Sequence, residues 1–384
     1  MSRRLVLLTE IISPYRIPLF NALASRSEVE LHVIFLSETD PSLRQWQVYK
    51  DEIRFSYEIL SSARKRVAGF NMLLNRGVAR ALDHKSPEVI LCGGYSYVAS
   101  WRAMFWAKSH GIPLILWSES NRQDSRRGHW LVEFLKRAFL KRCDRFVVPG
   151  RSARRYLSSH GVHDSFIYTA PNAVDNALFT KSADVACNDA VALRRRLQLP
   201  GRYFLFVGRF VAEKGVFELL SAYAKLDERL RTQIGLVLVG DGAAKPVLQE
   251  LAANITPGRV IFPGFAQREQ LPVYYALADM LILPTYTDTW GLVVNEGMAC
   301  GLPVILSCAA GCAEDLVEEN WNGLLIPPKD ESALVVAMER LATQSDVRLQ
   351  MAANSRQRIV RYSPEEWANG VVQAVGNTQG GMSA

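Results

Sequence analysis

Two acidic residues, Asp288 and Glu296, lie seven residues apart across a stretch with the features of a helix start. A short apolar run and a polar loop precede the stretch, Gly291 lies within it, and Gly301 and Pro303 follow it. This order is typical of a strand, a loop and a helix that ends at a glycine. The free backbone N–H groups at the start of such a helix attract an anion, usually a phosphate.

The two carboxylates would then flank that phosphate. Glu296 lies about 7.5 Å along the helix axis from Gly291, at 1.5 Å per residue, and its side chain leans back toward the helix start. A carboxylate accepts two hydroxyl hydrogen bonds at once, which suits a ribose diol or a sugar. The stretch therefore indicates a nucleotide sugar, with its phosphate on the amides of Gly291, Leu292 and Val293. The alternative is an ordinary unit in which Asp288 starts the helix and Glu296 faces solvent.

Cations and glycines follow the other strand-like runs of the second half. Arg209 and Lys214 lie on a loop that begins at Gly208, where they can clamp a diphosphate. The next two runs end in tight turns where a nucleobase can lie against exposed peptide groups, and these turns contain Gly240, Asp241 and Phe265. Each feature alone is also common in solvated loops, but they recur at successive strand ends.

In the first half, Glu119 follows a continuous apolar run and is either a functional acid or the cap of the next helix. Other strand ends of this half carry residues that can face the same cleft as Glu119: Tyr15, Arg16, Gly93, Gly94 and Tyr95.

The elements that position these residues are apolar runs of strand length that alternate with helical stretches almost throughout the chain. Such runs are typical of buried parallel strands, and two series of them predict an α/β protein with two doubly wound sheets. We expect a first domain over residues 1–180, a second over 200–361, and a final helix over 362–384. Ligands bind at the carboxyl ends of such strands, so we expect the site in a cleft between the domains.

The composition, with 49% hydrophobic and 22% charged residues, is ordinary for a soluble globular protein. Neither a Walker loop nor a dinucleotide-binding glycine turn follows the first strand, which argues against a kinase or a nicotinamide dehydrogenase. The apolar start is too short for a signal peptide and residues 89–117 are interrupted by polar groups, so we expect a cytoplasmic protein. The six scattered cysteines are expected to be reduced thiols, and no metal site is expected.

The net charge of +7 is uneven. Residues 1–180 hold 26 Lys and Arg against 16 Asp and Glu, whereas residues 181–384 hold 19 against 22. Within the basic half, residues 126–142 combine cations with aromatic residues, as do helices that lie on anionic membranes. We favour the other interpretation, an ordinary helix in which Leu131, Phe134, Leu135 and Ala138 pack on the sheet and the cations are solvated.

The order and spacing of these motifs over nearly the whole chain resemble those of the family-4 nucleotide-sugar glycosyltransferases, retaining enzymes with the GT-B fold of two facing Rossmann-like domains. The motifs that carry the resemblance are Gly208–Arg209 with Glu213–Gly215, Gly240–Gly242, Pro263–Phe265, Asp288–Glu296 with Gly301–Val304, Pro171–Asp175 and Tyr362–Pro364. The resemblance implies that the final helix crosses back onto the first domain.

By this resemblance, Arg209 and Lys214 hold the donor diphosphate, Asp288 binds the transferred sugar, Glu296 binds the ribose, and Glu119 has a catalytic role. The resemblance also implies that the strand-end residues of the first half form the acceptor side of the cleft: Tyr15, Arg16, Gly93, Gly94 and Tyr95. Asp288 stands where the family commonly has Glu, and a histidine common near the Glu119 position is absent.

The implied activity is a metal-independent, retaining transfer from a UDP-sugar or GDP-sugar to a hydroxyl acceptor, without a cofactor or nucleic-acid partner. The acceptor would be a lipid-linked or surface-polysaccharide precursor, with the basic domain at an anionic membrane. The alternatives are a sugar phosphorylase or disaccharide synthase on the same scaffold, and a catalytically silent member that binds a nucleotide or glycan.

Overall fold

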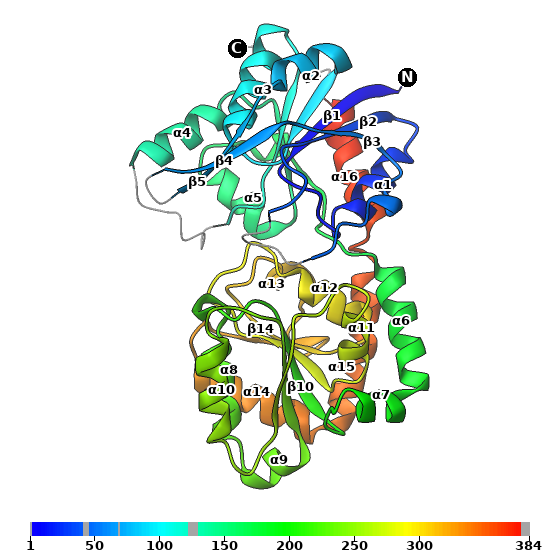
Figure 1. The fold of residues 1–384 in the computed structure, drawn as a ribbon, viewed down its shortest axis with the longest axis vertical. Coiled ribbons are helices and arrows are strands. Elements are labelled where there is room, and N and C mark those ends of the chain that lie inside the picture. The colour runs from blue at the N-terminus through cyan, green and yellow to red at the C-terminus, as the bar shows by residue number, and fades with distance from the viewer. Residues whose placement is uncertain (1, 41–45, 68–69, 122–129, 378–384) are drawn as a thin grey trace. The chain divides into compact units, whose positions relative to one another are not determined.

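The structure is a computed structural model that describes residues 2–40, 46–67, 70–121 and 130–377 (Figure 1). The chain divides into two compact units. Unit 1 consists of Met1–Val174 together with Ser363–Ala384, and unit 2 consists of Asp175–Tyr362.

The predicted domains left the division between residues 180 and 200, whereas the structure places it after Val174. The chain between those residues is largely helical and forms most of α6 (Asn176–Asn188) and α7 (Ala190–Arg196) in unit 2. Asp175 caps α6, because its carboxylate accepts a hydrogen bond from the Leu178 amide at 2.9 Å.

Seven strands of the described part of unit 1 form a parallel sheet in the order β3-β2-β1-β6-β7-β8-β9. These strands are β1 (Arg3–Thr9), β2 (Val29–Phe35), β3 (Ser56–Ile59), β6 (Val89–Cys92), β7 (Leu114–Trp117), β8 (Arg145–Val148) and β9 (Ile167–Thr169). The helices are α1 (Ile17–Ala24), α2 (Val78–Lys85), α3 (Val98–Ser109), α4 (Trp130–Leu140), α5 (Arg151–Ser158) and α16 (Pro364–Gly376), with 3-10 turns at Lys50–Glu52 and Asp164–Phe166.

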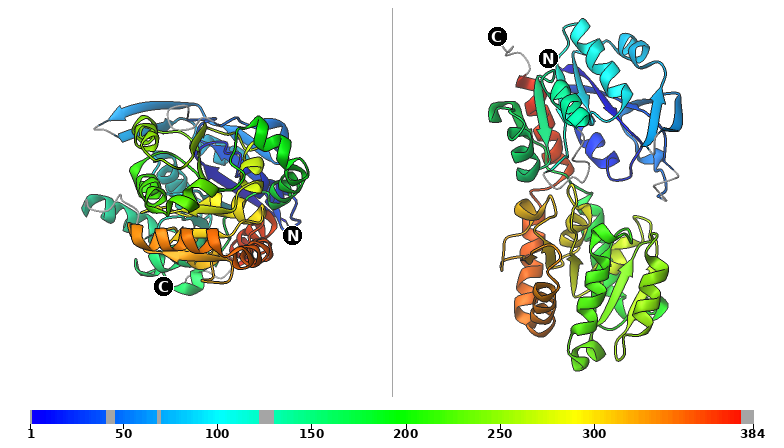
Figure 2. Two further views of the ribbon diagram at one scale, coloured as in Figure 1. Left: turned by 90° about the horizontal axis from the view of Figure 1, so that it is seen from below. Right: turned by 90° about the vertical axis from the view of Figure 1, so that its left-hand side faces the viewer.

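Buried apolar residues form two clusters in unit 1, which alternate along the strands: Leu5 and Leu7 of β1 belong to one, and Val6 and Leu8 to the other. Side chains that alternate in this way point to opposite faces of the sheet. Helices α1 and α16 contribute to the first cluster and α2 to α5 to the second, so both faces are covered, as Figure 2 shows from two sides.

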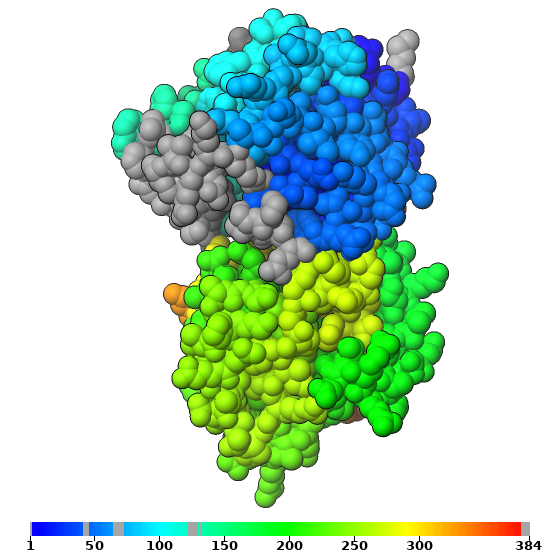
Figure 3. All heavy atoms as spheres, viewed as in Figure 1, coloured from blue at the N-terminus to red at the C-terminus, as the bar shows by residue number. Residues whose placement is uncertain are grey.

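Three strands were not predicted. β3 lies at the edge of the sheet, and β4 (Ser62–Val67) and β5 (Phe70–Asn75) form a separate antiparallel pair. Segments from the first hundred residues, in blue and cyan, form much of the surface of unit 1 on the face seen in Figure 3.

The described strands of unit 2 form a six-stranded parallel sheet in the order β12-β11-β10-β13-β14-β15. They are β10 (Tyr203–Val207), β11 (Gly235–Val239), β12 (Val260–Gly264), β13 (Met280–Leu283), β14 (Val304–Ser307) and β15 (Gly323–Ile326). A 3-10 turn spans Ala212–Lys214, and besides α6 and α7 the helices are α8 (Val216–Lys225), α9 (Glu228–Gln233), α10 (Lys245–Ala253), α11 (Leu271–Ala276), α12 (Leu292–Ala299), α13 (Ala313–Leu316), α14 (Glu331–Thr343) and α15 (Ser345–Ile359).

The expectation of two doubly wound parallel sheets is confirmed. In both sheets the strand order reverses beside the first strand, between β1 and β6 in unit 1 and between β10 and β13 in unit 2. Such reversal points open a crevice at the carboxyl ends of the strands, where ligands bind in folds of this kind. No helix in the described residues is long and apolar enough to cross a membrane.

The last helix, α16, is part of unit 1 and contributes to its buried core. Trp367 on α16 is fully buried, and its ring lies 5.7 Å from Phe20 of α1 and 5.2 Å from Trp117 of β7. Gly370 lets the helix approach β9 closely, since a Cβ atom there would lie 2.1 Å from the carbonyl oxygen of Thr169.

We therefore expect Gly370→Ala to destabilise unit 1 by roughly 1–3 kcal/mol, the usual cost of overpacking, although alanine normally favours a helix. Gly376→Ala, at the end of the same helix, has no heavy atom within 4 Å of the new Cβ and serves as the control. Thermal unfolding measures both. A melting temperature for Gly370→Ala equal to that of the control would contradict the close packing of α16.

Candidate functional site

Two loops meet at the point where the sheet of unit 2 reverses, one after β10 and one after β13. Lys214 from the first loop donates a hydrogen bond to Asp288 Oδ2 in the second at 2.6 Å. Their side chains are 15% and 17% exposed, so the ion pair is largely buried but still accessible to solvent. The structure thus brings together two residues, 74 positions apart, that the sequence assigned to one site.

Backbone contacts hold the two loops together beside this ion pair. The Tyr286 amide donates to the Glu213 carbonyl oxygen at 2.8 Å, and the Thr285 hydroxyl donates to the same oxygen at 2.9 Å. Gly215 has φ +68°, and a Cβ atom there would lie 2.1 Å from the Pro284 carbonyl oxygen. Only glycine allows the two loops to approach this closely.

Asp288 has two roles. Its Oδ2 atom accepts from Lys214, while its Oδ1 atom accepts from the Trp290 amide at 3.3 Å, just before α12 begins. The Gly311 amide donates to the Asp288 backbone carbonyl at 3.0 Å and so ties the loop to the segment that follows β14. Both proposed roles of Asp288, as a site residue and as a residue at a helix start, are therefore compatible.

Arg209 lies on the β10 loop with its side chain 54% exposed, and its guanidinium is 3.5 Å from the Glu213 carboxylate. A pair this open to water contributes little to stability, so the guanidinium can exchange partners readily. The loop is held to the end of β11, because the Phe210 amide donates to the Asp241 carbonyl oxygen at 2.8 Å. Gly240, at the end of β11, also lies against the β10 loop, since a Cβ atom there would lie 1.9 Å from the Gly208 carbonyl oxygen.

The predicted tight turns follow β11 and β12. Asp241 Oδ1 accepts from the Gly242 amide at 2.8 Å and lies 3.8 Å from the Lys245 ammonium. The Gly240 amide donates to the Gly264 carbonyl oxygen at 2.8 Å, which places the turn before Phe265 beside the other two. Phe265 itself is exposed, so it presents an apolar ring at this edge.

The helix predicted after Gly291 is present as α12. Gly291 occupies the N-cap position with φ +100°, a left-handed conformation that glycine adopts without strain. Leu292 and Val293 form the first turn, are half-buried, and follow no side-chain cap. The first amides of α12 therefore lack intrahelical acceptors, as at every helix start.

Glu296 is 1% exposed, so the alternative in which it faces solvent is wrong. Its Oε2 atom accepts from the Tyr275 hydroxyl of α11 at 2.5 Å. A contact of Glu296 with a ribose stays a prediction. Tyr275 was not predicted because it lies within an apolar helix with no motif around it.

In unit 1, Arg16 and Glu119 form an ion pair, with Arg16 Nη2 donating to Glu119 Oε1 at 2.5 Å. Arg16 Nη1 also donates to Asn172 Oδ1 at 3.1 Å, and the guanidinium lies 4.1 Å from the centre of the Trp117 ring. The acceptor-side cation and the proposed catalytic acid therefore meet. Asn172 is buried and was missed as a site residue, although it lies in the Pro171–Asp175 motif.

The other acceptor-side residues surround the reversal point of unit 1. The Gly93 amide donates to the Leu8 carbonyl oxygen at 2.8 Å, and Gly94 turns the chain with φ +105°. Tyr15 packs edge-on against Trp46. Burial raises the pKa of Tyr95 to about 12, although hydrogen bonding with Ser120 opposes the shift. Tyr95 is therefore neutral at physiological pH.

The basic segment after β7 contains the expected helix, α4, but the side chains of this helix are oriented differently from the expectation. Residues 122–129 lie outside the described residues, and α4 follows them. Phe134 and Leu135, expected to pack on the sheet, are 61% and 43% exposed. The cation Lys136, expected to be solvated, is 7% exposed. Two of the residues that were assigned to the core thus point to solvent, while Ala138 is half-buried.

All six cysteines lie in described segments and are free thiols. Among the described residues, no group of three or more His, Cys, Asp or Glu side chains is arranged to hold a metal ion.

Comparison with known families gives two matches that divide the chain. Residues 19–178 match the model described as Glycosyltransferase Family 4, and residues 193–358 match the model described as Glycosyl transferases group 1. Among curated relatives, the alpha-D-kanosaminyltransferase of Streptomyces kanamyceticus is 28% identical over 69% of this chain and 70% of its own. The D-inositol 3-phosphate glycosyltransferase of Corynebacterium urealyticum is 32% identical over 55% of this chain and about half of its own, 51%.

Solved structures match over nearly the whole chain. The glycosyltransferase of Rickettsia africae superposes with a TM-score of 0.78 at 13% identity, covering 99% of both chains. The Anabaena protein HepE, solved in complex with UDP, superposes with a TM-score of 0.75 at 17% identity, covering 98% of this chain and 100% of its own. The fold is therefore the GT-B fold.

We expect Tyr275→Phe to destabilise unit 2 by roughly 1–3 kcal/mol, because a buried carboxylate loses a hydrogen-bond donor. Tyr274→Phe is the matched control, since the Tyr274 carbonyl oxygen, which accepts from Tyr203, is unchanged. Thermal unfolding compares the two variants. Equal melting temperatures would show that the Tyr275 hydroxyl does not support Glu296.

Proposed function

This chain belongs to the family 4 glycosyltransferases, and from that membership we propose that it transfers a sugar from a nucleoside diphosphate sugar to a hydroxyl acceptor with retention at the anomeric carbon. The observation that carries the proposal is the ion pair of Lys214 and Asp288 beside the start of α12. A cation, a carboxylate and free helix amides at one reversal point suit a diphosphate joined to a sugar.

The Lys214–Asp288 pair supports a specific sequence of events. In the structure, Asp288 balances the charge of Lys214 at 2.6 Å. A diphosphate offers Lys214 more negative charge than one carboxylate does, so the ammonium turns to the phosphate oxygens. Asp288 is then released to accept hydrogen bonds from the hydroxyls of the transferred sugar. The Asp288 carboxylate would thus pair with Lys214 in one state and recognise the sugar in the other.

Cleavage of the bond between sugar and phosphate places negative charge on the departing diphosphate. We propose that Arg209, Lys214 and the first amides of α12 stabilise this charge as it develops, which is the form of catalysis that preorganised donors provide. These groups would supply the positive charge without a metal ion. A phosphate oxygen of the leaving group would take the proton from the acceptor hydroxyl on the same face of the sugar.

For the donor we propose a UDP-sugar or a GDP-sugar. The adjoining turns at Gly240 and Phe265 offer peptide groups and an exposed ring to the base. Similar folds provide support, because HepE was solved with UDP-glucose and an Escherichia coli protein with UDP-2-fluoro glucose. A thermal-shift series with UDP, GDP and ADP chooses between the bases, and stabilisation by none of them would argue against the proposal.

For the acceptor we propose a lipid-linked or surface-polysaccharide precursor at an anionic membrane. The support comes from α4 and the turn after it. Trp130 and Phe134 of α4 are 75% and 61% exposed, and Arg137 of α4 and Lys141 and Arg142 of the turn are exposed as well. Exposed aromatic residues together with cations are typical of surfaces that lie in the interface of an anionic bilayer. This arrangement corresponds to a cytoplasmic enzyme that binds the inner face of the cell membrane peripherally.

We expect Arg209→Ala and Lys214→Ala each to lower turnover by roughly 10²-fold or more, the scale of losing one preorganised donor. Release of the nucleoside diphosphate from UDP-glucose or GDP-mannose measures the effect. Arg229→Ala, which removes an exposed cation of α9, is the control and should leave turnover unchanged. Near-normal turnover in both site variants would refute the assignment, and strong inhibition by EDTA would refute metal independence.

We also expect Phe134→Ser and Trp130→Ser to weaken sedimentation with vesicles that contain anionic lipid, because each removes an exposed aromatic group from the proposed contact. Val191→Ser, which removes an exposed apolar side chain in unit 2, is the control and should not change sedimentation. Equal sedimentation of the unaltered chain with neutral and anionic vesicles would exclude the membrane contact.

A further inference from the structure

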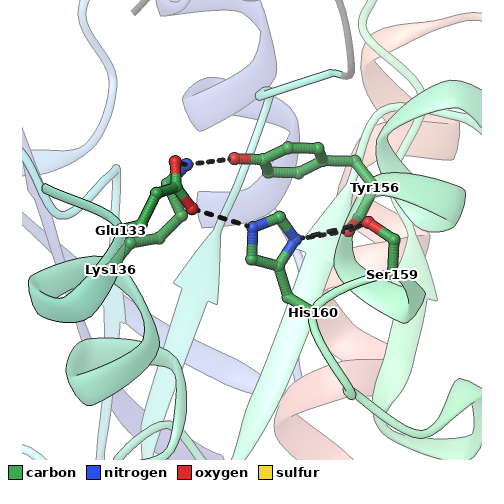
Figure 4. Close-up of polar contacts among 5 residues, drawn as sticks. All are labelled: Glu133, Lys136, Tyr156, Ser159 and His160. Carbon is green, nitrogen blue, oxygen red and sulfur yellow. Dashed lines mark hydrogen bonds and ion pairs between the residues drawn. The ribbon is translucent and has the colours of Figure 1, made fainter. Parts of the chain in front are cut away.

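Polar side chains that the proposed reaction does not use are grouped in more than one part of the chain. In unit 1, Lys136 of α4 donates to Glu133 and to the Tyr156 hydroxyl of α5, and Figure 4 shows this group between the two helices. In unit 2, another group surrounds Trp290, two residues after the site residue Asp288. This second group contacts the proposed donor site directly.

Trp290 and the segment after β14 hold the Asp288 carboxylate and its backbone. The Trp290 amide donates to Asp288 Oδ1 at 3.3 Å, whereas Lys214 donates to Oδ2. The amides of Gly311 and Cys312 donate to the carbonyl oxygens of Asp288 and Trp290 at 3.0 and 3.1 Å. These contacts remain when Lys214 turns to a diphosphate. The position of Trp290 therefore sets the position of the carboxylate that is left to bind the sugar.

The Trp290 side chain is anchored inside unit 2. It is 2% exposed, and its indole Nε1 donates to Asn295 Oδ1 of α12 at 2.9 Å. The centre of the indole lies 6.4 Å from that of the Tyr362 ring, with 41° between the two planes, a distance at which aromatic rings attract each other. The donor helix and Tyr362 thus both hold the indole.

Tyr362 is itself held by contacts with two helices. Its hydroxyl donates to the Asp315 carbonyl oxygen of α13 at 2.6 Å, and its own carbonyl oxygen accepts from Asn176 Nδ2 of α6 at 3.0 Å. The same amide group donates to the Ile359 carbonyl oxygen at 3.1 Å. Unit 2 ends at Tyr362 and begins one residue before Asn176. The two ends of unit 2 are therefore joined to each other and, through Trp290, to the donor loop.

We propose that Tyr362 is a positioning residue for recognition of the transferred sugar, and that it acts by packing against Trp290, which holds the Asp288 carboxylate. This inference rests on the proposed transferase function. It adds that the choice of sugar depends on the point where the chain leaves unit 2. The nucleotide contacts proposed for Arg209, Lys214 and the turns after β11 and β12 come from other loops, so the nucleotide itself should be recognised with little change.

The test compares Tyr362→Leu, which removes the ring, with the unaltered full chain. Trp106→Leu, which removes a half-buried indole from α3 of unit 1, is the control. Titration calorimetry with UDP and UDP-glucose, and in parallel with GDP and GDP-mannose, separates the nucleotide and sugar contributions to binding. Hydrogen exchange of the Gly311 and Cys312 amides, measured without nucleotide, reports how firmly the donor loop is held.

We expect the Kd for the nucleotide sugar to rise roughly 10-fold in Tyr362→Leu, the scale of losing a hydrogen bond to a charged group, while the Kd for the nucleoside diphosphate stays within about twofold. The Gly311 and Cys312 amides should exchange faster, and the control should change neither quantity. Tyr362→Phe removes only the bond to the Asp315 carbonyl and should cause smaller changes in the same direction. It keeps the test decisive where Tyr362→Leu folds poorly.

A double-mutant cycle with Asp288→Asn identifies the route. If Tyr362 acts through Asp288, Tyr362→Leu should add little to the loss of nucleotide-sugar affinity that Asp288→Asn causes alone, because residues that act as a unit are not additive. Full additivity, equal losses for the nucleotide and the nucleotide sugar, or unchanged amide exchange would overturn the positioning role and leave the proposed function intact. Absence of binding of every nucleotide by the unaltered chain would instead overturn the proposed function and the inference that rests on it.

Discussion

The donor-side site depends on close contact between backbones. Gly215 lies against the Pro284 carbonyl, and Gly240 lies against the Gly208 carbonyl. No larger residue fits either position, because the nearest oxygen is already at van der Waals contact with the glycine. These two contacts draw the loops that follow three adjacent strands into one small region. The ion pair of Lys214 and Asp288 is a consequence of that approach.

The two units carry a similar ion pair at the reversal point of the sheet. Each sheet reverses its strand order beside its first strand. In each, a cation from the loop after the first strand pairs with a carboxylate from a loop across the reversal point, Arg16 with Glu119 in unit 1 and Lys214 with Asp288 in unit 2. Parallel sheets bring the carboxyl ends of their strands to one edge, so charged groups placed there need partners until a ligand arrives.

Buried parallel strands were readable from the sequence because they form continuous apolar runs, and the residues at their carboxyl ends were readable with them. The runs Leu114–Trp117 and Met280–Leu283 coincide with β7 and β13. Strands β3 and β4 carry no such run, and the short run Met72–Leu74 in β5 was not identified as a strand. Contacts between side chains that are distant in the sequence could not be predicted either. The contacts of Tyr275 with Glu296 and of Asn172 with Arg16 join elements that no local pattern relates.

The helix α4 shows where periodicity misleads. Its apolar residues occur at helical spacing, and that pattern normally marks the buried face. The structure exposes Phe134 and buries Lys136 instead. The cation is accommodated because Tyr156 on α5 and Glu133 on its own helix supply acceptors, and the acceptor on α5 lies far away in the sequence.

The position of α16 within the core of unit 1 also affects how the protein is made. Trp367 packs against Phe20 and Trp117, so part of that core consists of residues that the ribosome adds after unit 2. Unit 2 is continuous in sequence and is synthesised completely before α16 emerges. Domains generally fold as units during synthesis. We therefore expect unit 2 to fold first in the nascent chain, while unit 1 keeps an exposed apolar surface until α16 is synthesised.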